Sequence, residues 1–392
     1  MKRHLVHLAL AATLAVSAMA ASPVLPLTQH GGKWPAGHVQ GIAVDVNGGY
    51  IYYSFTTLLA KYDFSGKLIG TIENLPAHMG DMDFNPDDGL LYASFENLPN
   101  QAYYVTMIDG SKIDRVGIDL AKTDIFHTVY IAEILKDYLV DLNHDGKITL
   151  DYGKNREDEA KSPDHRYGVA GFDGVGFGPA FGRTAGPRYL TLAYGIYNNL
   201  DRTDNDHQVL LQYDVSNWAQ YARPFRPDAP HRSGPPAPHG KYFVRTGHTT
   251  WGVQNLSYDE SLQRWFLGVY QGKKKEFPNY LLFAVDASTQ PVLGDLLGVP
   301  GPGGQDWEQG LLLALADDGL KDPATGIRGW NQKADVGFQS VGGGLFYLSK
   351  NSGGKDAKGR GWQSADLTLM RWTGEANRPF VPATAADLPP RR

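Results

Sequence analysis

Two histidines occupy equivalent positions in two similar stretches of the chain, which are about 40 residues apart, a spacing typical of a structural repeat. His38 precedes Val-Gln-Gly-Ile and His78 precedes Met-Gly-Asp-Met, and each stretch then passes through an Asn/Asp/Gly turn into a segment that ends in Ser-Phe. Two imidazoles at one rim can bind a metal ion, act as general base and acid, or hydrogen-bond to backbone groups. Their repeated placement favours a working site that contains both histidines.

The position two residues after each histidine recurs in five segments of the chain and is polar in four of them. Burying a polar side chain without a partner is costly, so this recurrence predicts a water-accessible channel and argues against core filling. A polar channel without any chemistry is the alternative. The residues at this position are Gln40, Gly80, Asp173, Gln254 and Gln339.

The elements that must position these residues are the strands of a repeated β-unit. A strand–turn–strand pattern begins near residues 38, 78, 171, 252 and 337, and a third strand follows in later copies. We therefore predict an all-β fold, a five-bladed β-propeller whose inner strands line a central channel. Because the later copies are about twice as far apart as one blade length, a seven-bladed ring is the alternative.

Insertions account for most of the extra length. We expect one short amphipathic helix near 124–140, a charged loop at 151–164 and a proline-rich loop at 223–239. The fifth copy lacks an obvious fourth strand. Val24 to Leu27 are expected to supply it and so close the ring, which removes the unpaired edges of an open array.

The first residues predict an export signal. Lys2 and Arg3 precede an apolar run, and Ala18-Met19-Ala20 is a small-x-small cleavage pattern. We therefore expect a signal peptide at 1–20, a single propeller domain at 21–392, and a periplasmic or secreted protein. No segment reaches the roughly 20 apolar residues of a membrane span. The net charge of −5 with interspersed signs argues against nucleic acid as a partner, and the absence of cysteine excludes thiol chemistry.

Two further segments lead into the third and fourth copies and are expected at the same mouth as the histidines. The first contains Arg166 and Tyr167, and the second contains His248 and Trp251. A lyase that acts on uronic acids needs a cation for the carboxylate, a base and an acid. Arg166, either histidine and Tyr167 could fill these roles, although neighbours on an extended segment point in opposite directions.

A hydrolase would instead need two carboxyl groups across the scissile bond. Asp173 is the best candidate on the channel, with Asp335 or Glu308 near the fifth copy as partners. Asp81 lies in the alternate register and is expected to face between blades. A third alternative is a non-catalytic propeller that binds a saccharide or protein through aromatic residues. These residues are Trp251, Tyr270, Tyr197 and Trp307.

One loop has the pattern of a calcium site. Asp141, Asn143, Asp145 and Gly146 match positions one, three, five and six of an EF-hand-like loop. The twelfth position is Tyr152 where that loop needs a carboxylate. The matching positions one, three, five and six still predict structural calcium here, and a simple Asp-Gly turn is the alternative.

Four segments resemble those of an uncharacterised family of secreted bacterial β-propellers over nearly the whole mature chain. They are His38-Val39-Gln40-Gly41, His165-Arg166-Tyr167-Gly168, His231-Arg232-Ser233-Gly234 and Thr250-Trp251-Gly252-Val253-Gln254-Asn255. The architecture is similar to propeller polysaccharide lyases and five-bladed glycoside hydrolases, a likeness of fold alone.

Together, these features predict a carbohydrate-active enzyme. We expect β-elimination on an acidic saccharide at His38, His78, Arg166 and Tyr167, with hydrolysis at Asp173 or non-catalytic binding as alternatives. The side chains expected to contact the saccharide are Gln40, His248, Trp251, Gln254 and Gln339.

Overall fold

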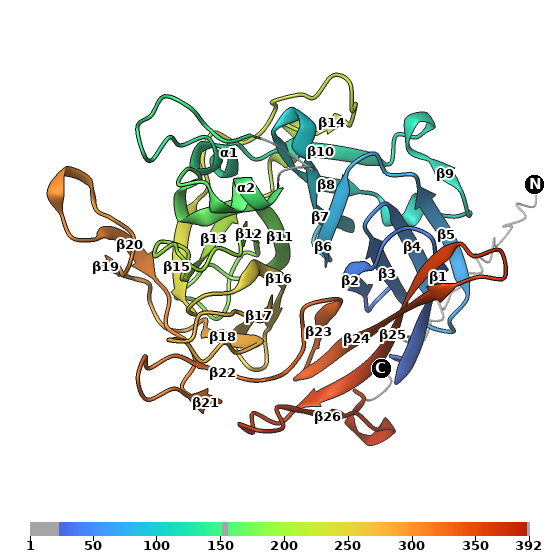
Figure 1. Ribbon diagram of the computed structural model, residues 1–392. Helices are drawn as coiled ribbons and strands as arrows, with labels where there is room; N and C mark the ends of the chain where they lie inside the picture. Colours follow the sequence, from blue (N-terminus) through green and yellow to red (C-terminus); the bar gives the residue numbers. More distant parts are fainter. Residues whose placement is uncertain (1–22, 151–155, 390–392) are drawn as a thin grey trace, which may run out of the picture.

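The strands form five sheets around a common axis, as Figure 1 shows. The structure is a computed structural model that describes residues 23–150 and 156–389. Around the ring, each inner strand packs against the inner strands of its two neighbours. The ring is therefore closed with five blades, which confirms the predicted propeller and excludes the seven-bladed alternative. The inner strands are β2 (Val39–Asp45), β6 (His78–Asn85), β11 (Val169–Gly178), β16 (Thr250–Asp259) and β23 (Phe338–Gly342).

Blades one and two each have four antiparallel strands. A short fifth strand pairs with the outermost of these four. Blade one continues outward from β2 through β3 (Tyr50–Phe55), β4 (Leu58–Asp63), β5 (Leu68–Glu73) and β9 (Ile118–Asp119). Blade two continues outward from β6 through β7 (Leu90–Asn97), β8 (Ala102–Ile108), β10 (Phe126–Tyr130) and β14 (Arg223–Pro224).

Blade three is extended by a hairpin that projects from the ring, and blade four has three main strands. Blade three continues from β11 through β12 (Tyr189–Ile196), β13 (His207–Tyr213), β15 (Gly240–Arg245), β20 (Glu308–Leu312) and β19 (Val292–Leu296). Blade four continues from β16 through β17 (Arg264–Tyr270) and β18 (Leu282–Asp286). Beside it lies the small hairpin β21 (Leu320–Lys321) and β22 (Arg328–Gly329).

The first and last strands of the described chain meet in blade five. There β24 (Leu345–Lys355) and β25 (Gly361–Trp372) follow β23, and β25 pairs with both β1 (Thr28–Trp34) and β26 (Phe380–Pro382). Closure by an N-terminal strand is thus confirmed, but the strand begins later than Val24 to Leu27. Pro26 has no backbone N–H to donate, so regular pairing starts beyond it.

The helical prediction near 124–140 is correct only in its second half. Helix α1 is Ala132–Tyr138, whereas Phe126–Tyr130 is β10, the fourth strand of blade two. The sequence Phe-His-Thr-Val-Tyr is rich in aromatic and β-branched residues, which suit a half-buried strand. The other α-helix is α2 (Arg156–Lys161). No helix in the described part of the chain is long and apolar enough to cross a membrane.

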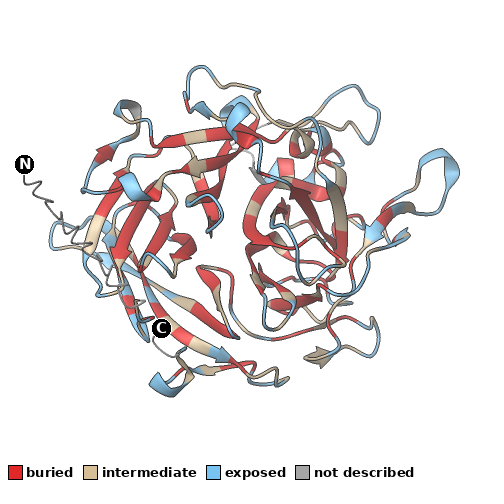
Figure 2. Cartoon of the chain, turned by 180° about the vertical axis from the view of Figure 1, so that it is seen from behind, coloured by how far each residue is buried: buried red, intermediate tan, exposed pale blue. Residues whose placement is uncertain are grey.

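One apolar cluster fills each interface between neighbouring blades, so that the buried faces of the sheets are stacked around the ring (Figure 2). The largest lies between blades two and three, where the ring of Tyr92 meets Phe177 edge to face at a centroid distance of 5.0 Å. The serines of the repeated Ser-Phe pairs add hydrogen bonds between blades. Ser54 Oγ donates to Gly80 O, and Ser94 Oγ donates to Asp173 O.

Four of the five inner strands carry a β-bulge near their start, and the fifth does not. In β23, Phe338, Gln339 and Ser340 pair in unbroken register with β24. Bulges change which way the following side chains point. The shifts in the other four strands fall between Val39 and Gly41, Met79 and Met82, Phe172 and Val175, and Val253 and Asn255.

The carboxylate of Asp81 crosses the axis of the ring. Its Oδ2 accepts the backbone N–H of Val175 and of Leu256, both at 3.0 Å, and its Oδ1 accepts the amide of Asn255 at 2.8 Å. The same amide also donates to Gln40 O. We expected Asp81 to face between two blades, but the bulge in β6 turns it inward, where it joins blades two, three and four.

We predict that Asp81→Ala strongly destabilises the fold. Asp81 is only 1% exposed, and each buried donor left without an acceptor costs about 1–3 kcal/mol. Because the backbone N–H groups of Val175 and Leu256 lose their acceptor and the Asn255 amide loses one of its acceptors, the free energy of unfolding in urea should fall by several kcal/mol. Asp87→Ala, at an exposed position in the following turn, should change it by less than about 0.5 kcal/mol. Equal effects of the two changes would contradict an axial role.

A second buried carboxyl group makes stability depend on pH. Burial raises the pKa of Asp83 from 3.8 to about 7. The folded state therefore binds a proton that the unfolded state releases, and the stability that Asp83 contributes is lost as pH rises through about 7. We expect Asp83→Asn to reduce the difference in unfolding free energy between about pH 5 and pH 8. An unchanged difference would show that Asp83 titrates alike in both states; Asp87→Asn is the control.

Candidate functional site

A cavity of about 150 Å³ opens where the inner strands begin, and we call this end of the axis the first mouth. Six of the residues that the sequence predicted for one site line this cavity. They come from blades one to four. Glu96 and Tyr270 complete its polar lining. The predicted residues at the first mouth are His38, Gln40, His78, Asp173, Trp251 and Gln254.

His38 lies against Tyr270, with 3.4 Å between the imidazole Nε2 and the phenol oxygen. Burial lowers the pKa of His38, the neighbouring His78 lowers it further, and Asp335 partly opposes both effects. The lowered pKa favours a neutral imidazole at neutral pH, which can donate or accept a hydrogen bond. His38 thus adds hydrogen-bonding capacity to the mouth without a fixed positive charge.

His78 faces Glu96, a residue that the sequence analysis missed. Their closest atoms, His78 Nδ1 and Glu96 Oε2, are 3.8 Å apart, and Glu96 Oε1 accepts the N–H of Phe172 at 2.7 Å. A Cβ atom at Gly171 would come within 1.9 Å of the same carboxylate, so only glycine fits there. A carboxylate directly after the repeated Ser-Phe pair was the available signal, since that end of β7 leads to the mouth.

Asp173 and Gln254 are held together across two blades. Gln254 Nε2 donates to Asp173 Oδ2 at 3.0 Å and to the backbone oxygen of Trp251 at 2.8 Å. Both side chains come from bulged positions of β11 and β16, which accounts for their shared direction. The first mouth therefore has two carboxylates, Glu96 and Asp173, from neighbouring blades.

Trp251 forms an aromatic part of the wall and has an unusual backbone. Its φ is +63°, and Gly252 follows with φ of +72°. A left-handed conformation costs a bulky residue about 1–3 kcal/mol and persists only where the surroundings enforce it. Gly252 is required, because a Cβ there would lie 2.3 Å from Tyr194 O. Tyr197 packs edge to face on the Trp251 ring at 6.3 Å.

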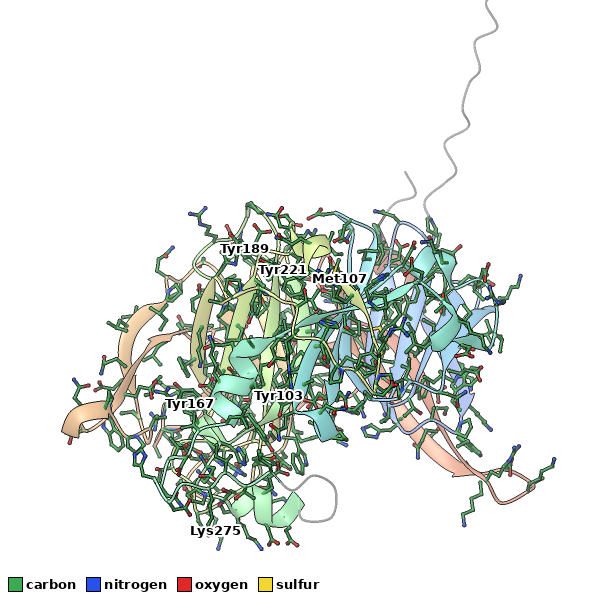
Figure 3. The ribbon with its side chains drawn as sticks, turned by 90° about the horizontal axis from the view of Figure 1, so that it is seen from above. Tyr103, Met107, Tyr167, Tyr189, Tyr221 and Lys275 are labelled. Carbon is green, nitrogen blue, oxygen red and sulfur yellow. The ribbon has the colours of Figure 1, made fainter. Side chains whose placement is uncertain are left out.

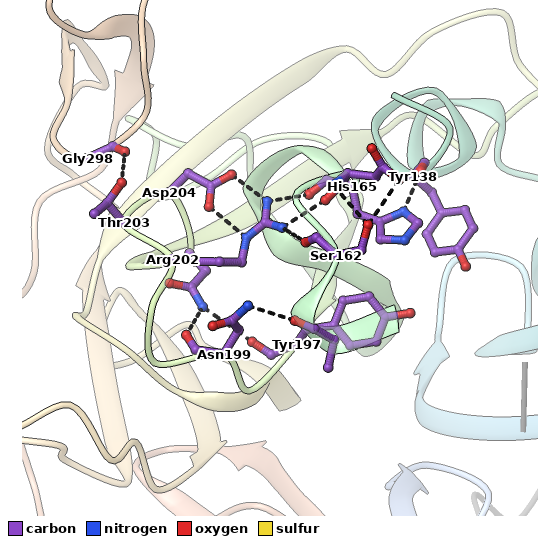
Figure 4. A network of polar contacts seen from close by, with 12 residues as sticks. Tyr138, Ser162, His165, Tyr197, Asn199, Arg202, Thr203, Asp204 and Gly298 are labelled. Atoms are coloured by element: carbon purple, nitrogen blue, oxygen red, sulfur yellow. Dashed lines mark hydrogen bonds and ion pairs between the residues drawn. The ribbon is translucent and has the colours of Figure 1, made fainter. Parts of the chain in front are cut away.

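The loop behind Trp251 is held by the guanidinium of Arg202 (Figure 4). Arg202 binds the carboxylate of Asp204 through two nitrogens and donates to the backbone oxygens of Ser162, Asp164 and His165. Lys274 adds a second buried contact, with Asp206 at 2.6 Å. The polar segment from Tyr197 to Asp206 is therefore a fixed support.

Arg166 and Tyr167 do not line the first mouth. Both bind Glu308 on β20, each at 2.6 Å, on the side of blade three that carries the projecting hairpin (Figure 3). Left-handed residues at His165 and Tyr167 break the extended path, so the two neighbours converge on one carboxylate. The elimination site expected from the sequence thus lacks its cation and its acid, and Glu308 is not a channel carboxylate.

Two other predicted contacts lie elsewhere. His248 is 1% exposed, its Nδ1 accepts the N–H of Lys273, and burial lowers its pKa to about 4. Gln339 lies at the opposite end of the axis, where its Nε2 donates to Asp83 at 3.1 Å. The sequence alignment placed Gln339 with Gln254, but the missing bulge in β23 carries it deeper along the channel.

In the loop at 141–146, the side chains at positions one and three accept backbone N–H groups of the loop itself. Asp141 accepts the N–H of Asp145 and Gly146, and Asn143 Oδ1 accepts the N–H of Asp145. Tyr152, at the twelfth position, lies outside the described residues, as does the predicted signal peptide. In the described part of the chain, this loop included, no three His, Asp or Glu side chains are grouped to hold a metal ion.

No protein-family model and no curated protein match the sequence. Among solved structures, the Dos1 propeller is 11% identical and aligns over 88% of this chain and 69% of its own, with a TM-score of 0.31. A protein of unknown function from Bacteroides caccae is 10% identical over 64% of this chain and 78% of its own, with a TM-score of 0.27. Similarities this low indicate nothing about function. The number of blades follows from the strand pairing of this chain alone.

Calcium at 141–146 stays a prediction with a direct measurement. If the loop binds calcium, addition of a chelator should lower the melting temperature, because a ligand bound only to the folded state stabilises it. Asp145→Ala should remove this response and Asp158→Ala, on the exposed face of α2, should preserve it. A melting curve that is the same with calcium and with chelator would leave a simple Asp-Gly turn as the explanation.

Proposed function

We propose that the first mouth binds one ring of a neutral saccharide. The observation that carries this proposal is the Trp251 ring set in the wall of a small cavity beside polar side chains from several blades. An aromatic face suits the apolar face of a sugar ring, and amide and carboxylate groups suit its hydroxyls. Drug-sized ligands occupy pockets of about 300–1,000 Å³, so a cavity of about 150 Å³ fits a single ring.

Charge favours a neutral sugar over a uronic acid. The described lining of the first mouth includes Glu96 and Asp173 but no arginine or lysine. A uronate would meet two carboxylates there without a cation to bind its own. Arg166, which was expected to hold it, is paired with Glu308. We therefore no longer favour β-elimination at this mouth.

The floor of the mouth favours the end of a saccharide chain. Beneath the cavity, Asp81 and Asn255 are hydrogen-bonded to each other across the axis, and both are buried. A chain cannot thread through a channel that is closed in this way. The ligand would enter from one side and present its terminal ring to Trp251.

Hydrolysis of the terminal bond is the second candidate, and the paired carboxylates favour it. Glycoside hydrolysis uses two carboxyl groups around the scissile bond. Glu96 and Asp173 accept hydrogen bonds from Phe172 N–H and Gln254 Nε2, which hold the two carboxyl groups in place at the mouth. His78, beside Glu96, could then supply the proton that the leaving oxygen requires.

We expect calorimetry with neutral and uronic oligosaccharides to find binding of neutral ones only. Trp251→Ala should weaken it at least about tenfold, a loss of about 1.4 kcal/mol, while the exposed Trp307→Ala on the projecting hairpin should not. Selective binding of uronates, or equal effects of the two changes, would contradict the proposal. The melting temperature of each variant checks its fold.

The same saccharides separate binding from catalysis. Release of reducing ends that Asp173→Asn abolishes, with binding retained, would establish a hydrolase. Binding without new reducing ends would leave the first mouth as a non-catalytic site. Ultraviolet absorbance of an unsaturated uronate would instead restore β-elimination.

A further inference from the structure

A second cavity, of about 330 Å³, opens at the other end of the axis, where the inner strands end. We call this end the second mouth. It is larger than the first mouth and is separated from it by the hydrogen-bonded Asp81 and Asn255. A ligand at the second mouth would therefore bind independently of one at the first.

The floor of the second mouth contains a buried acceptor that lacks a donor. Gln339 is 6% exposed, its Nε2 donates to Asp83 Oδ1, and its Oε1 has no hydrogen-bond partner among the described residues. Asp83 is 7% exposed, and its Oδ2 accepts the N–H of Phe177 at 2.8 Å. Leaving a buried acceptor unsatisfied costs about 1–3 kcal/mol, so a ligand that donates to this floor gains that amount.

Charges of both signs stand on the rim. Arg188 is exposed, lines the cavity, and makes no hydrogen bond or ion pair with any described residue. Glu260 lines the same cavity, and its carboxylate is also without a described hydrogen-bond partner. The cavity therefore offers a guanidinium to an anionic group and carboxylates to a cationic group.

We infer that the second mouth binds a small zwitterion of the amino-acid type. Its ammonium group would donate to Gln339 Oε1 and lie beside Asp83 and Glu260, and its carboxylate would bind Arg188. An ammonium group has three donors and no acceptor, which matches the unsatisfied Gln339 Oε1 and the carboxyl groups of Asp83 and Glu260. Guanidinium groups bind carboxylates through parallel hydrogen bonds, which matches the unpaired Arg188.

The raised pKa of Asp83 predicts how the affinity for this ligand depends on pH. Burial raises its pKa to about 7, whereas Arg188, Gln339 and the N–H groups of Phe84 and Phe177 partly oppose the shift. Asp83 in turn helps to raise the pKa of the neighbouring Asp81, for which burial is the main cause. An ammonium group beside Asp83 would favour its ionised form, so affinity should increase as pH rises through about 7.

The test is calorimetric titration of the purified protein with four probes that differ in charge. 4-Aminobutyrate and L-lysine carry both groups, n-butylamine has only the ammonium, and butyrate has only the carboxylate. At least one of the first two should bind about tenfold or more tightly than n-butylamine and butyrate. If neither exceeds n-butylamine and butyrate, the inference is overturned.

Two variants locate the binding. Arg188→Ala, at an exposed position without described partners, should reduce the affinity of the preferred probe to that of n-butylamine. Gln339→Met removes the acceptor at similar volume and should weaken binding too. Arg183→Ala, nearby but outside the cavity, and Trp251→Ala, at the first mouth, should leave the affinity unchanged. Binding that survives Arg188→Ala unchanged would overturn the assignment even if Gln339→Met fails to fold.

Discussion

The structure depends on how the buried backbone groups around the axis find partners. Inner strands that meet at an axis leave N–H groups facing one another, and bulges leave still more of them outside the regular ladder. The carboxylate of Asp81 accepts N–H groups from two other blades, and Asn255 extends the contact to blade one. Burial raises the pKa of Asp81 well above its usual value, and hydrogen bonds from the backbone N–H groups of Val175, Leu256 and Met82 offset part of that shift. This one side chain both joins the blades and divides the channel into two mouths.

The two mouths differ because the inner strands differ. At the first mouth, bulged strands turn Gln40, Asp173 and Gln254 toward one cavity, and it combines carboxylates with an aromatic wall. Strand β23, whose register shifts only near its end, between Ser340 and Gly342, contributes nothing equivalent there. Its Gln339 instead reaches the second mouth and binds Asp83. One missing bulge thus gives the two ends of a repetitive fold different chemistry.

The repeats were sufficient to predict the five blades, the closing N-terminal strand and six residues of the first mouth. The repeats gave wrong side-chain positions where the backbone departs from the regular alternation of side chains along a strand. Arg166 and Tyr167 were placed at the mouth because their segment leads into a blade, yet left-handed residues redirect both to Glu308. Gln339 was misplaced because sequence similarity does not reveal whether a strand carries a bulge. Glu96 could not be predicted from the repeated inner strands, because it lies on β7, the second strand of its blade.

The backbone strain at Trp251 shows that its neighbours hold the wall of the first mouth in one conformation. Trp251 has a backbone conformation that a tryptophan avoids, and the next residue must be glycine to clear Tyr194 O. Such a conformation persists only where neighbours enforce it. The contact with Tyr197 and the Arg202 contacts behind it provide that support. A side chain held in this way loses little further freedom on binding, which is the main entropic advantage of a preorganised site.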